Sequence, residues 1–298
     1  SLQFCVDMAA GIMERPTGAF RSRADEERAG LHTRASRRAM WHLLPVWALV
    51  VLTTKVDRGN ISFVAGELMA RLEMSNAQFG QAAGLFFLTY MAFQLPSLWV
   101  ARRMGMRRWT TALLLSWAAI TSVTAFVTST WQLSMLRLAL GAAEAGTFAM
   151  MYAHLDSYLL QADFSLAWAI VAPGTSAVSS LVAGPLAAAF LASTPPFGLQ
   201  PWQWLLVGEG LLAASIGAVV WATMLESPET DTCFSDEERR ALLEAKAREG
   251  RAKGEPPAAK VGPSPTSPSP HSRHPTVTTP TSITSTCPAR RQHCALHI

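Results

Sequence analysis

Four charged residues lie inside two long apolar stretches of this 298-residue sequence, where ionised side chains are rarest. They are Asp57, Arg58, Arg137 and Glu144. Ionised groups at membrane depth are costly, so those that are present usually face a bundle interior or an aqueous cavity and bind ions, protons or substrates. The alternative interpretation is that the four residues form two structural ion pairs that hold helices together.

The spacing of these residues indicates how helices would present them. Arg137, Gly141 and Glu144 follow one another at i, i+4 and i+7, so they share one helix face. Asp57 and Arg58 are adjacent and point about 100° apart, so they cannot both face one partner directly. A buried carboxylate beside an arginine can exchange a proton, and an arginine can bind a carboxylate or phosphate with two hydrogen bonds. The combination predicts proton-coupled handling of a small anion.

The composition predicts that lipid surrounds these residues. Half of the chain is apolar and only 15% is charged, against about 25% in soluble proteins. Six apolar runs are each long enough to cross a bilayer, at 43–62, 79–100, 109–127, 133–155, 166–191 and 204–225. A large soluble helical bundle would rarely contain six such runs. We therefore predict an all-α integral membrane protein, a bundle of six transmembrane helices in contact with the lipid bilayer.

The basic residues indicate the orientation of this multi-pass bundle. Three clusters precede the first run, separate the second from the third, and follow the sixth: Arg34, Arg37 and Arg38; Arg102, Arg103, Arg107 and Arg108; Arg239, Arg240, Lys246 and Arg248. The opposite loops contain almost no basic residue, so both ends of the chain are predicted to be cytoplasmic. The net charge of +4 does not predict nucleic-acid binding, because topology places the basic residues. We expect the plasma membrane, with an organelle membrane as the alternative.

Composition also divides the chain into four segments. Residues 1–40 are expected to be a disordered or weakly helical cytoplasmic segment, and 41–228 the six-helix transmembrane domain. Residues 229–250 should form a cytoplasmic helix, which Ser235 would cap. Residues 251–298 are rich in Pro, Ser and Thr and are expected to be disordered.

No enzymatic site is predicted. The cysteines Cys5, Cys233, Cys287 and Cys294 show no metal-binding spacing and are interpreted as free thiols. No Ser/His/Asp set and no glycine-rich phosphate loop is present at a helix end. We expect neither a metal nor a cofactor.

Several motifs resemble one transporter family in their order and spacing. The segment 57–62 reads Asp-Arg-Gly-Asn-Ile-Ser and is followed by Phe-Phe-Leu-Thr-Tyr at 86–90, Gln-Leu-Pro-Ser at 94–97 and Gly-Met-Arg-Arg-Trp at 105–109. Residues 137–146 match the pattern R-x-x-x-G-x-x-E-A-G, and Trp-Gln-Trp at 202–204 precedes Glu-Gly at 209–210. These motifs resemble the N-terminal half of the anion:cation symporters of the major facilitator superfamily, closest to the allantoate permease-like and related organic-anion branches.

The resemblance implies a fold of twelve helices in two six-helix halves, with the substrate between the halves and helices one and four lining its N-terminal side. By position, Asp57 and Glu144 would be the proton-linked carboxylates, and Arg58 and Arg137 the cationic partners of the substrate or of those carboxylates. Gating or packing roles fall on Gly105, Arg107, Arg108, Gly141, Gly146, Gly184 and Pro185. Relatives tend to have a basic run between helices four and five, where this chain has residues 161–165 without one.

The implied function is proton-coupled symport of a small organic anion of the carboxylate type. Only six spans are predicted here, which leaves three explanations: a partial gene product, a half-transporter that self-associates, or a chain that no longer transports. The alternative function is therefore a non-transporting protein that binds or regulates a full-length relative. If the chain does transport, its protein partner would be a missing C-terminal half or a second copy of the chain.

Overall fold

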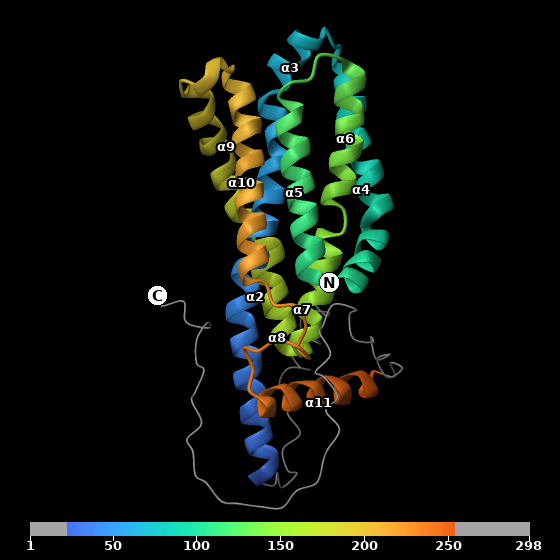
Figure 1. Ribbon diagram of the computed structural model, residues 1–298, viewed down its shortest axis with the longest axis vertical. Coiled ribbons are helices and arrows are strands. Elements are labelled where there is room, and N and C mark those ends of the chain that lie inside the picture. The colour runs from blue at the N-terminus through green and yellow to red at the C-terminus, as the bar shows by residue number, and fades with distance from the viewer. Residues whose placement is uncertain (1–22, 254–298) are drawn as a thin grey trace, which may run out of the picture.

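The computed structural model describes residues 23–253, and all regular secondary structure in this range is helical. The helices stand side by side in one bundle, and α11 (Asp236–Ala252) lies across one end of it (Figure 1). We call this end the α11 end and the opposite end, which carries α3 (Ala65–Leu72), the α3 end. The predicted disordered tail lies outside the described residues from 254 onward, as do residues 1–22.

Six helical columns make up the bundle. The remaining elements are α2 (Arg23–Phe63), α4 (Asn76–Met104), α5 (Met106–Thr124), α6 (Thr130–Glu144), α7 (Thr147–Tyr158), α8 (Gln161–Ala169), η1 (Ile170–Gly174), α9 (Thr175–Ala192), η2 (Pro196–Gly198) and α10 (Pro201–Thr223). The columns are α2, α4, α5, the α6–α7 pair, the α8–η1–α9 series and α10. The predicted all-α six-column architecture is therefore present.

The helices of the structure differ from the predicted spans in three places. The first helix begins at Arg23, well before the predicted span, and continues through Pro45, which lacks one backbone hydrogen bond. The fourth predicted span is two helices, because the chain turns at Gly146. The fifth widens into a π-turn that contains Pro173, whose missing N–H cannot support a regular α-helical bond there.

Length and composition alone support four of the six membrane spans in the described range. They are 30–63, 76–104, 161–192 and 201–223. The predicted spans 109–127 and 133–155 do not reach the required length and hydropathy as single helices. The short helix α5 includes Arg107 and Arg108 and several Thr and Ser residues, and the other span is broken into α6 and α7. Both still stand in the bundle, where α5 packs against α10 and α6 packs against α4.

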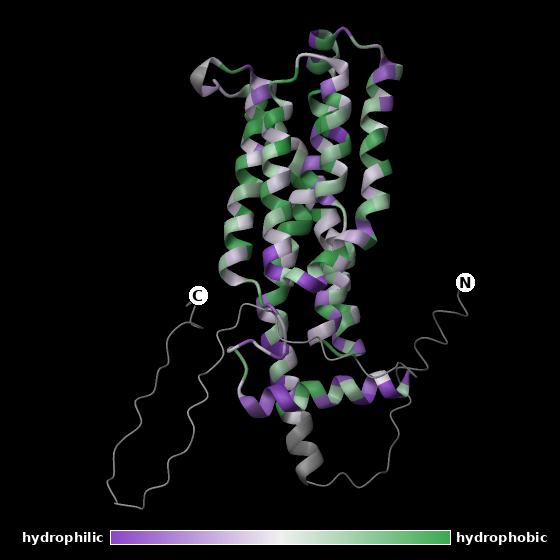
Figure 2. Ribbon diagram, turned by 45° about the vertical axis from the view of Figure 1, so that its right-hand side comes forward, coloured by the Kyte–Doolittle hydropathy of each residue, from purple (hydrophilic) through white to green (hydrophobic). Residues whose placement is uncertain are grey.

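The surface of the columns is apolar, as contact with lipid requires. Hydrophobic residues predominate along the columns, whereas α11 is mostly hydrophilic (Figure 2). Large exposed side chains include Leu88, Leu95, Met91, Leu181 and Trp221. The helix ends that carry the three basic clusters all meet at the α11 end. The cytoplasmic location of that end stays a prediction.

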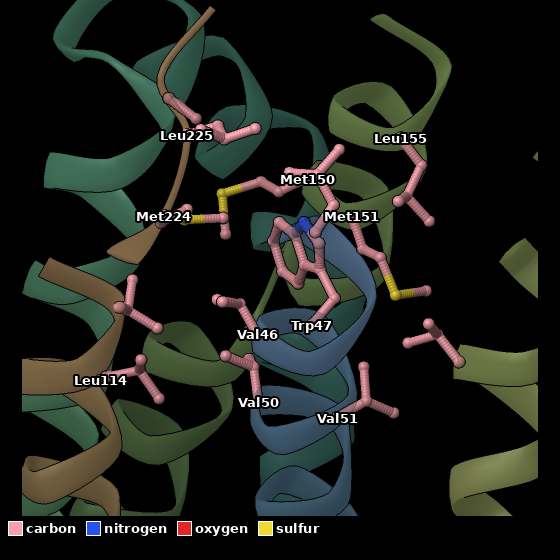
Figure 3. Packing of buried hydrophobic residues seen from close by; sticks show 14 of the residues in the cluster. Val46, Trp47, Val50, Val51, Leu114, Met150, Met151, Leu155, Met224 and Leu225 are labelled. Carbon is pink, nitrogen blue, oxygen red and sulfur yellow. The ribbon is translucent and has the colours of Figure 1, made fainter. Parts of the chain in front are cut away.

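The interior of the bundle is packed around Trp47 near the α11 end (Figure 3). This fully buried side chain of α2 lies among Met150, Met151 and Met224, and its indole N–H donates to His154 Nδ1 at 3.0 Å. Flexible methionine side chains suit an irregular junction of helices. The packing fixes α2 against α7 and the exit of α10, and α2 is the helix that carries Asp57 and Arg58.

Candidate functional site

The site is built around one buried ion pair between α2 and α6. Arg58 Nε lies 2.9 Å from Glu144 Oε2, and the Glu144 side chain is fully buried. Arg58 Nη2 and Glu144 Oε1 are both buried and have no hydrogen-bond partner. The pair is thus only partly satisfied, which leaves one N–H donor and one carboxylate oxygen free to bind something else.

Two aromatic rings of α4 hold the Arg58 guanidinium. Its central carbon lies 4.3 Å from the Tyr90 ring centroid and 5.3 Å from that of Phe86. The two rings stack on each other with centroids 5.7 Å apart. A planar guanidinium is stabilised over an aromatic face, so the rings orient the donor that Glu144 leaves free.

Asp57 faces a different helix from Arg58, as their predicted angular offset requires. Thr121 of α5 donates its hydroxyl to Asp57 Oδ1 at 3.3 Å, and the Asp57 side chain is buried. Asn60, one turn further on, is 1% exposed and neither atom of its amide has a hydrogen-bond partner. Unpaired polar atoms in a buried region commonly mark a place where water or a ligand binds.

Arg137 and Glu209 complete the charged site. Arg137 on α6 is 7% exposed and lies within electrostatic reach of Asp57, Glu144 and Glu209. Among residues 23–253 no hydrogen bond or ion pair involves the Arg137 side chain. The structure thus brings all four predicted site residues together from two helices, and it adds Glu209 from α10.

Glu209 was not among the site residues predicted from the sequence. The residue appeared only as part of a motif. Glu209 is the single charged residue within the apolar run 204–225, and this feature of the sequence could have indicated a functional role. Tyr90 and Phe86 were also quoted without a role. Aromatic residues are too common in membrane helices for their type alone to reveal a partner.

Two glycines of the fourth column allow it to approach α4. A Cβ atom at Gly141 would overlap the backbone carbonyl of Phe86, and Thr89 donates its hydroxyl to the Leu138 carbonyl at 2.7 Å across the same contact. Gly146 adopts a left-handed φ of 83°, and a Cβ there would lie 2.6 Å from Ser97. This close contact places the α4 rings beside Glu144.

The other predicted gating or packing residues lie away from the charged site. Gly105 joins α4 to α5 with φ 98°, and a side chain there would overlap Glu226. Arg107 Nε lies 3.5 Å from Glu226 Oε2. Burial raises the pKa of Glu226, and the guanidinium groups of Arg107 and Arg108 offset part of that increase. These residues therefore form a separate ionic contact at the α11 end.

Gly184 and Pro185 lie within α9 and do not take part in either cluster. A Cβ atom at Gly184 would meet no atom within 4 Å, so close packing inside the described chain does not explain this glycine. The helix continues past Pro185 without a break. Relatives tend to have a basic run where this chain has residues 161–165. Here the Asp163 carboxylate accepts a hydrogen bond from the Ser36 hydroxyl of α2.

One surface hollow of the described chain lies apart from the charged site. It has a volume of about 640 Å³ and lies between α4 and α6 toward the α3 end, where Gln78, Gln81 and Ser134 line it. None of the charged residues borders it.

Comparison with known sequences identifies the family. Residues 47–283 match the Major Facilitator Superfamily. A putative tartrate transporter of Agrobacterium vitis is 30% identical over 75% of this chain and 52% of its own length. A putative metabolite transport protein of Pseudomonas putida is 28% identical over 72% of this chain and 49% of its own. The chain spans about half the length of the curated relatives it matches.

Solved structures agree with the fold. A bacterial homologue of the human lysosomal transporter Spinster, in an inward-facing and occupied conformation, matches with a TM-score of 0.55 and 18% identity over 64% of this chain and 45% of its own. The inward-facing and unoccupied form matches with the same score over 72% of this chain. Together with the match over residues 47–283, the helical bundle and its buried charges show that this chain belongs to the major facilitator superfamily.

Proposed function

We propose that this chain forms the N-terminal half of a carrier that moves a small organic anion together with protons. The observation that carries the proposal is the partly satisfied pair between Arg58 and Glu144. Arg58 Nη2 is a buried donor without a partner, which suits an oxygen of an anionic substrate. Glu144 holds Arg58 through only one carboxylate oxygen, so binding of the substrate competes with this contact.

Proton binding is coupled to the same competition between the substrate and Glu144 for Arg58. When a substrate anion binds Arg58, the ion pair between Arg58 and the buried Glu144 is weakened. Protonation of Glu144 then removes the cost of an uncompensated buried charge. Asp57 lies close enough to Glu144 to repel it, which adds to this effect. Anion binding and proton binding therefore support each other, which is the condition for symport.

The substrate class follows from the donors and from the relatives. A fixed guanidinium favours planar, bidentate anions, and carboxylates fit this geometry. A relative described as a putative tartrate transporter makes tartrate the first compound to test. The second half of the substrate site would come from a C-terminal half or a second copy of the chain.

Uptake of radiolabelled tartrate and related carboxylates by cells expressing the gene tests this function. Wild-type uptake should increase when the external pH is lowered, and Asp57→Asn and Glu144→Gln should each abolish that increase. Arg58→Lys retains the charge but not the bidentate fork, so it should weaken uptake at every pH. Unchanged transport and pH dependence in the two carboxylate variants would contradict the assigned roles. Absence of uptake together with co-purification of a full-length carrier would instead favour the non-transporting alternative.

A further inference from the structure

Glu209 is the least satisfied carboxyl group of the charged site. Its side chain is buried on α10 with 6% exposure, and neither carboxylate oxygen has a hydrogen-bond partner. It lies within electrostatic reach of Asp57, Arg137 and Glu144. The next residue, Gly210, lets α10 approach α5 closely, because a Cβ there would lie 2.7 Å from the Ala118 carbonyl. This contact turns Glu209 into the bundle interior.

The charges around Glu209 do not balance when every group is ionised. The helices that face it supply two further carboxyl groups and two guanidinium groups: Asp57 and Arg58 from α2, and Arg137 and Glu144 from α6. The remaining cation of this region, Lys55 on α2, lies over the Phe148 ring, 5.3 Å from its centroid. The only ionisable residues of α5 are Arg107 and Arg108 at its other end, and α9 has none. Lys55 is not among the groups that act electrostatically on Arg137, Glu144 or Glu209, and without it three negative and two positive charges leave one excess negative charge.

The partners of the three carboxyl groups decide where that excess is neutralised. Glu144 has Arg58 at 2.9 Å, and Asp57 accepts a hydrogen bond from Thr121. Glu209 has neither an ion-pair partner nor a donor within the described residues. An ionised carboxylate without a hydrogen bond in a buried, low-dielectric region is the costliest of the three, so this group gains the most from protonation.

We propose that Glu209 is a third proton-binding group of this site, which carries the proton that balances the buried charges. Arg137 is its partner when the proton leaves, because this guanidinium is within electrostatic reach of Glu209 and has no ion pair of its own. This inference rests on the proposed function in that it enlarges the same site, but proton binding by Glu209 is measurable without transport.

Infrared difference spectroscopy of the purified full chain in lipid nanodiscs tests the assignment directly. A protonated buried carboxyl group gives a carbonyl stretching band separate from that of an ionised carboxylate, and a pH titration should show this band in the wild type. Glu209→Gln is close to isosteric and should remove the part of the band that Glu209 contributes, whereas contributions from Asp57 and Glu144, which also bind protons in the proposed function, should remain. Asp57→Asn removes a neighbouring negative charge and should shift the titration of the band to lower pH, because the excess charge is then gone.

Control variants keep the result interpretable. Glu226→Gln changes a carboxyl group of the ionic contact near Arg107 and should leave the band in place. Glu209→Asp retains a carboxyl group, so a band should persist at an altered frequency, which separates loss of the proton from loss of the fold. A wild-type spectrum without the band, a band that Glu209→Gln leaves unchanged, or a band that sodium chloride titrates in place of pH would each overturn the proposal. A band that behaves as expected in a chain that takes up no anion would leave the proton site standing and contradict the transport function.

Discussion

The Arg58 side chain combines two interactions with a free donor group, and no other residue type could supply all three. Its guanidinium pairs with Glu144, lies over the ring of Tyr90 and keeps one N–H group without a partner. A lysine would retain the charge but would lose the planar fork and most of the stacking. Arg58 is therefore a structural counter-ion of a buried carboxylate, and in the proposed function it also binds the substrate anion.

Removal of Arg58 should destabilise the bundle because it leaves Glu144 buried without compensation. Arg58→Ala should lower the free energy of unfolding by about 3 kcal/mol, at the lower limit for buried pairs because Arg58 is partly exposed. Adding Glu144→Gln should recover much of the loss, since the uncompensated charge is then absent. Unfolding in mixed detergent micelles measures both effects, and equal stability of the single and double variants would show that the pair is not coupled.

The sequence could predict those features of the site that depend on one helix, but not those that depend on contacts between helices. The offset between Asp57 and Arg58 follows from helix geometry, and the structure indeed gives them Thr121 and Glu144 as separate partners. The position of Glu209 depends instead on the close approach of α10 to α5 at Gly210. That contact joins distant parts of the chain, and no local pattern specifies it. The break between α6 and α7 was missed because the apolar run continues through it.

At the scale of elements, the contact between α4 and α6 positions the aromatic rings beside the ion pair. Gly141→Ala should separate these helices, because the added Cβ overlaps the Phe86 carbonyl, and it should cost about 1–3 kcal/mol of stability. Gly184→Ala provides a matched control on α9, where the Cβ meets no atom within 4 Å. The control should change stability by no more than about 1 kcal/mol. Thermal unfolding of both variants in the same detergent makes the comparison, and equal losses would contradict the packing role of Gly141.

At the scale of the whole molecule, α11 connects the two ends of the described chain. Arg38 near the start of the bundle lies 2.8 Å from Glu238, and Lys246 lies 3.1 Å from Asp156 of α7. The Gln161 backbone N–H donates to Glu249 at 3.0 Å. Each of these contacts is partly exposed and individually weak, but together they attach α11 to α2, α7 and α8.

The attachment of α11 should weaken in acid. Partial burial alone would raise the pKa of Glu249, but the Gln161 N–H and the ammonium groups of Lys246 and Lys253 outweigh burial, so its pKa is lowered. A lowered pKa means that this contribution is present above the ordinary carboxyl pKa and is lost as the pH falls through the folded-state value. A spin label on the exposed Ala247 should become more mobile on acidification.

Variants of α11 separate this cause from general acid unfolding. Glu249→Gln should make the label mobile across the whole pH range and remove the transition. Glu244→Gln changes an exposed carboxylate that has only a long contact to Arg248, and it should preserve the wild-type transition. The same transition in both variants would show that Glu249 does not control the attachment.

One continuous helix carries both the α11 contact and the charged site. Arg38 and Asp57 lie on α2, separated by about 28 Å along its axis at 1.5 Å per residue. If α2 changes its tilt when a proton or an anion binds, the same displacement reaches the contact between Arg38 and Glu238. Thermodynamic reciprocity then requires that whatever releases α11 also changes the affinity of the charged site by the same factor. Helix α11 would thus act as an allosteric modulator of the proposed proton site in the bundle.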